Sequence, residues 1–187
     1  QLSAEPGTPL RRRLRRGEFS LPGEEPSLEF FLATDDLLGR ASFLHYEVSN
    51  YARRPEFSSR HNGKYWRHVP YLGLGPSAHS FQDGRRWWNH RNLNEYLASL
   101  ADGRLPVAGS ETLGPNELRL ETLFLGLRTA DGIDLSSFRR RFGEELRETR
   151  KEILAALISE ALLIIAEDCL KPTARGMATA DRLAVLL

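Results

Sequence analysis

The chain has 187 residues, of which 41% are hydrophobic and 27% are charged, and its formal net charge is +1. This length can bury a sizeable core, and the composition is ordinary for a soluble globular protein. The near-neutral charge excludes an overall attraction to nucleic acid or to anionic lipid.

The cysteine content and the length of the apolar runs exclude further classes of protein. The one cysteine, Cys169, excludes a disulfide framework and any zinc or iron–sulfur site built from cysteines of this chain alone. The longest apolar runs have six residues, for example residues 161–166, and are too short to cross a bilayer. No signal-peptide pattern is present. We therefore expect a cytoplasmic protein without a membrane span and, because it starts at Gln1 rather than Met, a fragment of a longer one.

The first quarter of the chain predicts two helices and a strand. Residues 9–17 form a short basic helix with Thr8 as its cap and Pro9 in its first turn, and its arginine run is typical of a solvated face. Residues 25–40 place apolar side chains at helical spacing, and residues 43–52 alternate as a strand does. This order fits the end of an α/β unit.

The middle of the chain has little periodicity. Short strands are predicted at residues 71–75 and 85–90, followed by a helix that starts at Asn92 or Asn94 and runs to about residue 101. Residues 103–115 contain turn formers without a periodic pattern. We therefore expect the chain to divide there, into residues 1–105 and 106–187.

The remainder is mostly helical. Helices are predicted at residues 116–128, 134–143 and 144–161, then two short strands around a turn near Asp168, then a helix from about residue 177. Three helices followed by a small β-wing suggest a winged-helix module. The helix at 144–161 has mixed charge rather than a basic face, so a packing domain is favoured, with an inert or DNA-binding module as the alternative.

Residues 45–92 carry the strongest functional signal. They contain all five histidines, eight basic residues against three acidic ones, and several interleaved Tyr and Trp side chains. Cations beside flat aromatics suit a planar anionic ligand, either a nucleobase with phosphate or a tetrapyrrole with carboxylates. The other interpretation is a loop-rich surface whose arginines bind carbonyl groups and stack on tryptophans.

Two motifs lie within this stretch. His61 and Tyr65 are four residues apart, so on a helix they share one face, and both residue types serve as axial ligands of haem iron. The alternative is that the two side chains take part in hydrogen bonding within a core, which explains the same spacing. Residues 73–78, GLGPSA, match a dinucleotide-binding loop on paper, but Pro76 removes a donor and no amphipathic helix follows, so this match is rejected.

Several stretches together resemble one family. HYEVSNYAR, SRHNGKYW, YLGLGPSAHSF and ETLFLGLRTADGIDLSSFRRRFG, in this order, look like the C-terminal half of the HemW-like radical SAM haem chaperones, a family also described as oxygen-independent coproporphyrinogen III oxidase-like. The resemblance covers essentially the whole chain. It implies the C-terminal part of a partial TIM-like (β/α)₆ barrel with its extension over residues 1–105, followed by a helical, winged-helix-like domain over residues 106–187.

The resemblance also implies cofactors and partners. The family's C-x-x-x-C-x-x-C motif, which holds a [4Fe-4S] cluster that binds S-adenosylmethionine, does not occur in this chain. We therefore expect no catalytic residue and no radical chemistry from this chain alone, and we expect the other half of the barrel to be a partner. The implied function is haem binding and delivery to apo-haemoproteins. The alternative is a coproporphyrinogen III oxidase-like activity of the full-length protein.

The family's H-N-x-x-Y motif stands here at His61, Asn62 and Tyr65. The resemblance implies that this motif contacts haem and that His61 could bind the iron. The cationic neighbours Arg60, Lys64 and Arg67 are plausible partners for the haem propionates through charge-assisted hydrogen bonds.

Overall fold

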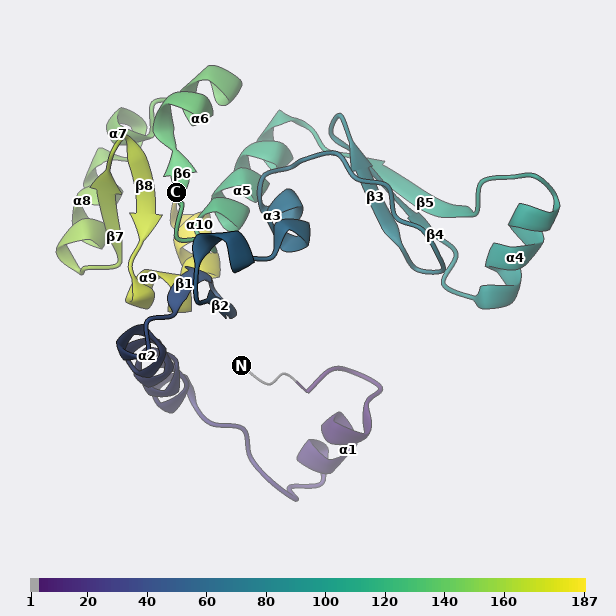
Figure 1. The fold of residues 1–187 in the computed structure, drawn as a ribbon, viewed down its shortest axis with the longest axis horizontal. Helices are drawn as coiled ribbons and strands as arrows, with labels where there is room; N and C mark the ends of the chain where they lie inside the picture. The colour runs from purple at the N-terminus through teal and green to yellow at the C-terminus, as the bar shows by residue number, and fades with distance from the viewer. Residues whose placement is uncertain (1–3) are drawn as a thin grey trace.

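The computed structural model describes residues 4–187 and shows a chain of short helices and three small antiparallel sheets (Figure 1). The expected mixture of helix and sheet is confirmed, and within residues 4–187 the strands close no barrel. None of the helices in this part of the chain is long and apolar enough to span a membrane.

The first segment contains two helices and a hairpin. Helix α1 (Pro9–Arg15) begins as predicted, because the hydroxyl of Thr8 accepts a hydrogen bond from the Arg11 amide at 3.2 Å. Helix α2 (Glu24–Arg40) follows, and its half-buried side packs on β1 (Leu44–Glu47) and on α9 near the end of the chain.

The single strand predicted at residues 43–52 is wrong, because the chain turns back on itself there. Strand β1 pairs with β2 (Asn50–Ala52) as an antiparallel hairpin. The buried carboxylate of Glu47 accepts hydrogen bonds from the Ser49 amide and from the side chain of Asn50, which stabilises the turn. A local acceptor of this kind favours a turn over continued extension.

The middle segment forms an arm that extends away from the other elements (Figure 1). Its sheet has the order β3 (His79–Gln82), β4 (Arg85–Asn89) and β5 (Val107–Thr112), with helix α4 (Leu93–Ala101) between β4 and β5. The strand predicted at residues 71–75 is wrong: only Tyr71 pairs there, with Phe81. Because β3 rather than a helix follows GLGPSA, the rejection of a dinucleotide loop is confirmed.

Between the hairpin and the arm lie a 3₁₀ turn (Pro55–Phe57) and helix α3 (Arg60–Trp66). The Ser59 hydroxyl caps α3 by accepting a hydrogen bond from the Asn62 amide at 3.2 Å. The helix ends before His68, whose φ of 50° is left-handed.

The last segment begins with helix α5 (Pro115–Gly126) and contains the third sheet, in the order β6-β8-β7. Its other elements are β6 (Ile133–Asp134), α6 (Leu135–Phe142), α7 (Leu146–Thr149), α8 (Lys151–Ser159), β7 (Leu163–Ala166), β8 (Cys169–Pro172), α9 (Ala174–Ala178) and α10 (Ala180–Leu186).

One long helix was predicted where the structure has α7 and α8. The helix breaks at Arg150, whose φ of −119° and ψ of 23° are not helical, and the Nε of Arg150 donates a hydrogen bond to the Leu187 carbonyl at 2.7 Å. The turn predicted near Asp168 is confirmed by the β7–β8 hairpin.

The hydrophobic core lies in this last segment. Its fourteen buried members all come from α5 to the end of the chain: Leu123, Leu127, Ile133, Leu135, Phe138, Leu146, Leu154, Leu157, Leu163, Leu170, Ala180, Leu183, Ala184 and Leu187. Helices α1, α2 and α3 contain no buried residue. The segment that carries the predicted site is therefore held by surface contacts rather than by a core of its own.

Candidate functional site

Helix α3 and the position that follows it carry the six residues predicted for the site. Arg60, His61, Asn62, Lys64 and Tyr65 lie within it, and the next position after the helix is Arg67. The helix is placed by its cap and by the hairpin, because the Ser59 amide donates a hydrogen bond to the Tyr46 hydroxyl at 3.2 Å.

His61 and Tyr65 form a pair on one face of α3. The hydroxyl of Tyr65 lies 3.0 Å from Nε2 of His61, and the two rings meet edge to face with centroids 5.1 Å apart. The Tyr65 ring in turn lies edge-on to Tyr71 at 4.7 Å, while His61 is exposed. The spacing of four residues therefore produces the contact that it predicted.

The electrostatic surroundings distinguish His61 from three other histidines. His45, His68 and His90 each lie within 3.3 Å of a carboxylate oxygen, from Asp35, Glu121 and Glu95 respectively. Within the described residues, no carboxylate lies within 4.0 Å of the His61 ring nitrogens. Among the described residues, His61 therefore lacks the carboxylate contact that each of the three other histidines makes.

A groove of about 1100 Å³ runs along a different face of α3, between that helix, β1 and α6. Arg60, Gly63 and Arg67 line it, as their spacing of three and four residues on a helix requires. Phe138 and Arg141 line it from α6. Of the six predicted site residues, only Arg60 and Arg67 face this groove, whereas His61, Asn62, Lys64 and Tyr65 do not line it.

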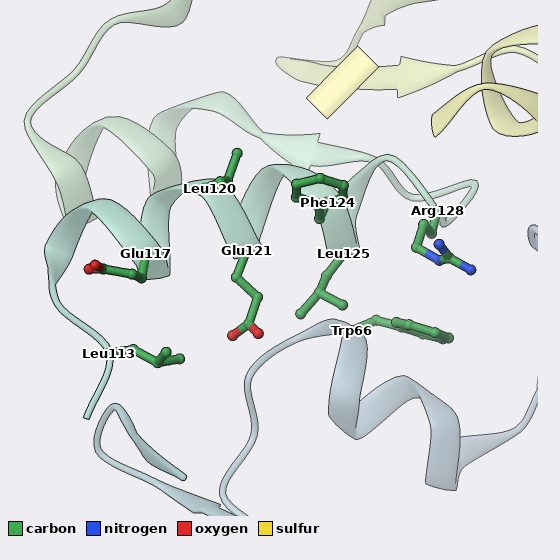
Figure 2. Close-up of a pocket in the computed structure, with 8 residues that line it drawn as sticks. All are labelled: Trp66, Leu113, Glu117, Leu120, Glu121, Phe124, Leu125 and Arg128. Atoms are coloured by element: carbon green, nitrogen blue, oxygen red, sulfur yellow. The ribbon is translucent and has the colours of Figure 1, made fainter. Parts of the chain in front are cut away.

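A second, smaller hollow of about 520 Å³ lies between α3 and α5 (Figure 2). Leu120, Phe124 and Leu125 of α5 line it together with Trp66 at the end of α3, and Figure 2 shows Leu125 pointing toward the Trp66 ring. The guanidinium of Arg128 stands 6.0 Å from the Trp66 ring centroid and forms an ion pair with Asp181 at 2.7 Å. Trp66 lines both this hollow and the groove, so it is the wall between them.

Glu121 of α5 connects the site to the arm. Its carboxylate binds Nε2 of His68 at 2.8 Å and a guanidinium nitrogen of Arg86 at 2.6 Å, and Arg86 also reaches Glu111 at 3.1 Å. The hydrogen bond from His68, with the hydrogen bond and charge of Arg86, lowers the pKa of Glu121 against the opposing effect of burial. The sequence offered no signal for this cluster, because His68 and Glu121 are 53 residues apart.

Replacing Glu121 by Gln should lower the free energy of unfolding by about 1–2 kcal/mol at pH 7, because it leaves Arg86 and His68 without their shared anion. Since the folded-state pKa of Glu121 is lowered, its contribution is complete above about pH 5 and is lost as the pH falls through that pKa. Urea unfolding at pH 7 and pH 4 measures the effect. The control is Glu117→Gln, an exposed position on the same helix. Equal stability of the two variants at pH 7 would contradict this role of Glu121.

The described part of the chain contains no set of ligands for an iron–sulfur cluster. No group of three or more His, Cys, Asp or Glu side chains there is arranged to hold a metal ion. Cys169 lies half-buried on β8 within the last segment. The residues present therefore do not fit a [4Fe-4S] cluster.

Comparisons with known proteins agree with the family suggested by the motifs. The family described as "HemN C-terminal domain" matches residues 113–179. "Heme chaperone HemW" of Mycobacterium tuberculosis (strain CDC 1551 / Oshkosh) is 39% identical over 180 residues, which cover 96% of this chain and 44% of the relative. "Heme chaperone HemW" of Synechocystis sp. (strain ATCC 27184 / PCC 6803 / Kazusa) is 38% identical over 84% of this chain and 38% of the relative.

A solved structure has a similar fold. Coproporphyrinogen III oxidase (HemN) from Escherichia coli, described as a radical SAM enzyme, superposes with a TM-score of 0.63 at 16% identity, over 89% of this chain and 42% of that chain. The chain spans less than half the length of each of these relatives. The chain thus matches the HemN C-terminal domain family over residues 113–179 and is similar to HemW haem chaperones over most of its own length.

Proposed function

We propose that this chain is the haem-contacting part of a HemW-like haem chaperone, and that α3 holds haem for delivery to apo-haemoproteins. The observation that carries the proposal is the exposed His61–Tyr65 pair, with Nε2 and the hydroxyl 3.0 Å apart and no carboxylate beside the histidine within residues 4–187. The relatives are named Heme chaperone HemW, and this name suggests haem as the ligand.

The chemistry of the pair suits haem iron. Imidazole and phenolate oxygen are both axial ligand types, and here one hydrogen bond links them at an accessible edge of the helix. Asn62 lies beside the pair, and the exposed Lys64 follows within one turn. We assign Arg60, Lys64 and Arg67 to the haem propionates, because guanidinium and ammonium groups bind carboxylates with charge-assisted hydrogen bonds.

Haem titration of the purified chain tests the proposal. We expect wild type to shift the haem absorbance band with a defined stoichiometry, His61→Ala to bind at least about 10-fold more weakly, and Tyr65→Phe to change the band position. His79→Ala is the matched control, because His79 is also exposed and has no carboxylate partner in the described chain. No change in absorbance with wild type would overturn the proposal for this chain. An equal loss in the His61 and His79 variants would overturn the assignment of His61.

The finer architecture is part of the proposal. We propose that residues up to about 50 are the end of a partial (β/α)₆ barrel, that residues 51–105 are its extension, and that residues 106–187 form a winged-helix-like domain. The helix–strand order of α2 and β1 and the match at residues 113–179 support this division. The sheet of the arm crosses the boundary at residue 105, since β5 at residues 107–112 pairs with β4.

The family also suggests the wider context. We propose a cytoplasmic protein in which another part of the barrel supplies the [4Fe-4S] cluster and the S-adenosylmethionine site. The likeness in fold to coproporphyrinogen III oxidase gives the second candidate, an oxidase-like activity of the full-length protein. Turnover of porphyrinogen by a cluster-bearing, full-length protein would favour this second candidate. Strongly salt-dependent retention on DNA would favour the third, a nucleic-acid-binding module.

A further inference from the structure

We infer that the groove between α3 and α6 binds the carboxylates of a flat, apolar dicarboxylic ligand, and that Arg141 of α6 is a binding residue of this site. The inference rests on the proposed function for the identity of the ligand as a tetrapyrrole. The groove itself supplies the observations for the site. Arg141 lies in the HemN C-terminal domain, whereas the ligand-binding residues proposed above all lie on α3 or directly after it.

The groove collects three guanidinium groups from two elements. Arg60 and Arg67 reach it from α3, and Arg141 reaches it from α6 on the other wall. Its volume of about 1100 Å³ is slightly above the usual range for small-ligand sites, and such sites occur preferentially between domains. Here α6 belongs to the HemN C-terminal domain and α3 precedes it.

These three arginines are available for a ligand. In the described structure none of them lies within 4.0 Å of a carboxylate, whereas Arg139 and Arg147 nearby pair with Glu145 and Asp168. The guanidinium of Arg141 stands 5.1 Å from the Phe142 ring centroid, which positions it without consuming its N–H donors.

The carboxylates of the groove are mostly committed elsewhere. Glu56 pairs with Arg54 at 3.8 Å, and Asp134 caps α6 by accepting a hydrogen bond from the Ser137 amide at 2.5 Å. Asp131 is exposed on the turn before β6. The arginines are therefore the groups of this groove that remain open to a carboxylate ligand.

Gly63 contributes by its lack of a side chain. The Nε of Arg67 donates a hydrogen bond to the Gly63 carbonyl at 3.1 Å, and a Cβ at Gly63 would stand 3.0 Å from a terminal nitrogen of Arg67. The glycine thus allows the guanidinium to lie against α3, on the groove side of the helix.

The apolar part of the lining suggests a flat ligand. Trp66 and Phe142 bring half-buried aromatic rings from α3 and α6 to the same groove, next to the buried Phe138. Rings and guanidinium planes together bind planar molecules with acidic substituents, and a tetrapyrrole with two propionates has both features. The His61–Tyr65 pair lies on a different face of α3, so carboxylate binding and iron ligation can be tested separately.

Fluorescence titration with metal-free protoporphyrin IX tests the inference, because this probe keeps both carboxylates and has no iron. We expect Arg141→Gln to weaken binding about 10-fold, in line with the loss of one charge-assisted hydrogen bond, and Arg141→Lys to recover part of it. Arg139→Gln removes the same charge from the same helix outside the groove and should bind as wild type does. The dimethyl ester should bind wild type at least about 10-fold more weakly than the diacid.

Three results would overturn the inference: equal affinity of Arg141→Gln and Arg139→Gln, equal affinity of the ester and the diacid, or no binding of the porphyrin to wild type. Circular dichroism confirms that each variant is folded. The haem titration described above tests the proposed function separately from this inference. A porphyrin affinity that falls in Arg141→Gln but not in His61→Ala supports the groove site even if His61 proves not to bind iron.

Discussion

Replacing Phe138 by Ala is expected to lower the free energy of unfolding by about 3–5 kcal/mol, the usual cost of removing a fully buried aromatic ring. Phe138 is 2% exposed and belongs to the core of the last segment. Its ring lies 4.8 Å from that of Phe142, and the guanidinium of Arg119 stands 5.9 Å from its centroid. A cavity here would therefore lose contacts on several sides at once.

Urea unfolding followed by far-UV circular dichroism measures this effect. Phe142→Ala should cost less, because Phe142 is only half-buried, and Phe57→Ala should cost almost nothing, because Phe57 is 66% exposed. A loss below about 1 kcal/mol for Phe138→Ala would show that this ring is not part of a packed core. Since Phe138 also lines the groove, the same variant should weaken porphyrin binding.

Replacing Gly132 by Ala should cost about 3 kcal/mol or more, for two reasons that add. Gly132 has a φ of 72°, a left-handed conformation that costs an L-residue about 1–2 kcal/mol. A Cβ there would also lie 2.3 Å from the Leu170 carbonyl oxygen and 2.8 Å from the Cα of Lys171. Both contacts are with the backbone of β8, so the pairing of β6 with β8 would have to move.

Gly143→Ala separates the two contributions. Gly143 ends α6 with a φ of 69°, nearly that of Gly132, but nothing lies within 4 Å of the position that its Cβ would occupy. Its replacement should therefore cost only the left-handed strain, about 1 kcal/mol. Chemical unfolding of both variants gives the difference directly. If the two lose the same stability, the close approach of Gly132 to β8 is contradicted.

The stability of the molecule and its candidate site have different origins. The core spans α5 to the end of the chain, whereas α3 has no buried residue and is attached through Trp66, His68 and the carboxylate of Glu121. Elements with few buried apolar contacts open more easily than core elements. This arrangement suits the role proposed for α3, which is to receive a ligand and release it.

Local sequence patterns predicted several elements well. Thr8, Asn92 and Asp134 cap helices because an oxygen of a short side chain reaches an amide two or three residues later. Gly143 ends α6 because its left-handed conformation is open to glycine. The errors at residues 43–52, 71–75 and 144–161 lie where other groups contact the chain: the buried Glu47 carboxylate in the first turn, Phe81 opposite Tyr71, and the Leu187 carbonyl bound by Arg150.

By itself, the sequence determined the family motifs, the caps and the pairing of His61 with Tyr65, because all of these depend on residues within one or two helical turns. The tertiary structure alone decided which face of α3 meets the groove, that Arg141 stands opposite Arg60 and Arg67, and that Glu121 joins His68 to Arg86. Those relations link positions tens of residues apart, and only tertiary packing, in which α3 contacts α5 of the HemN C-terminal domain, brings them together.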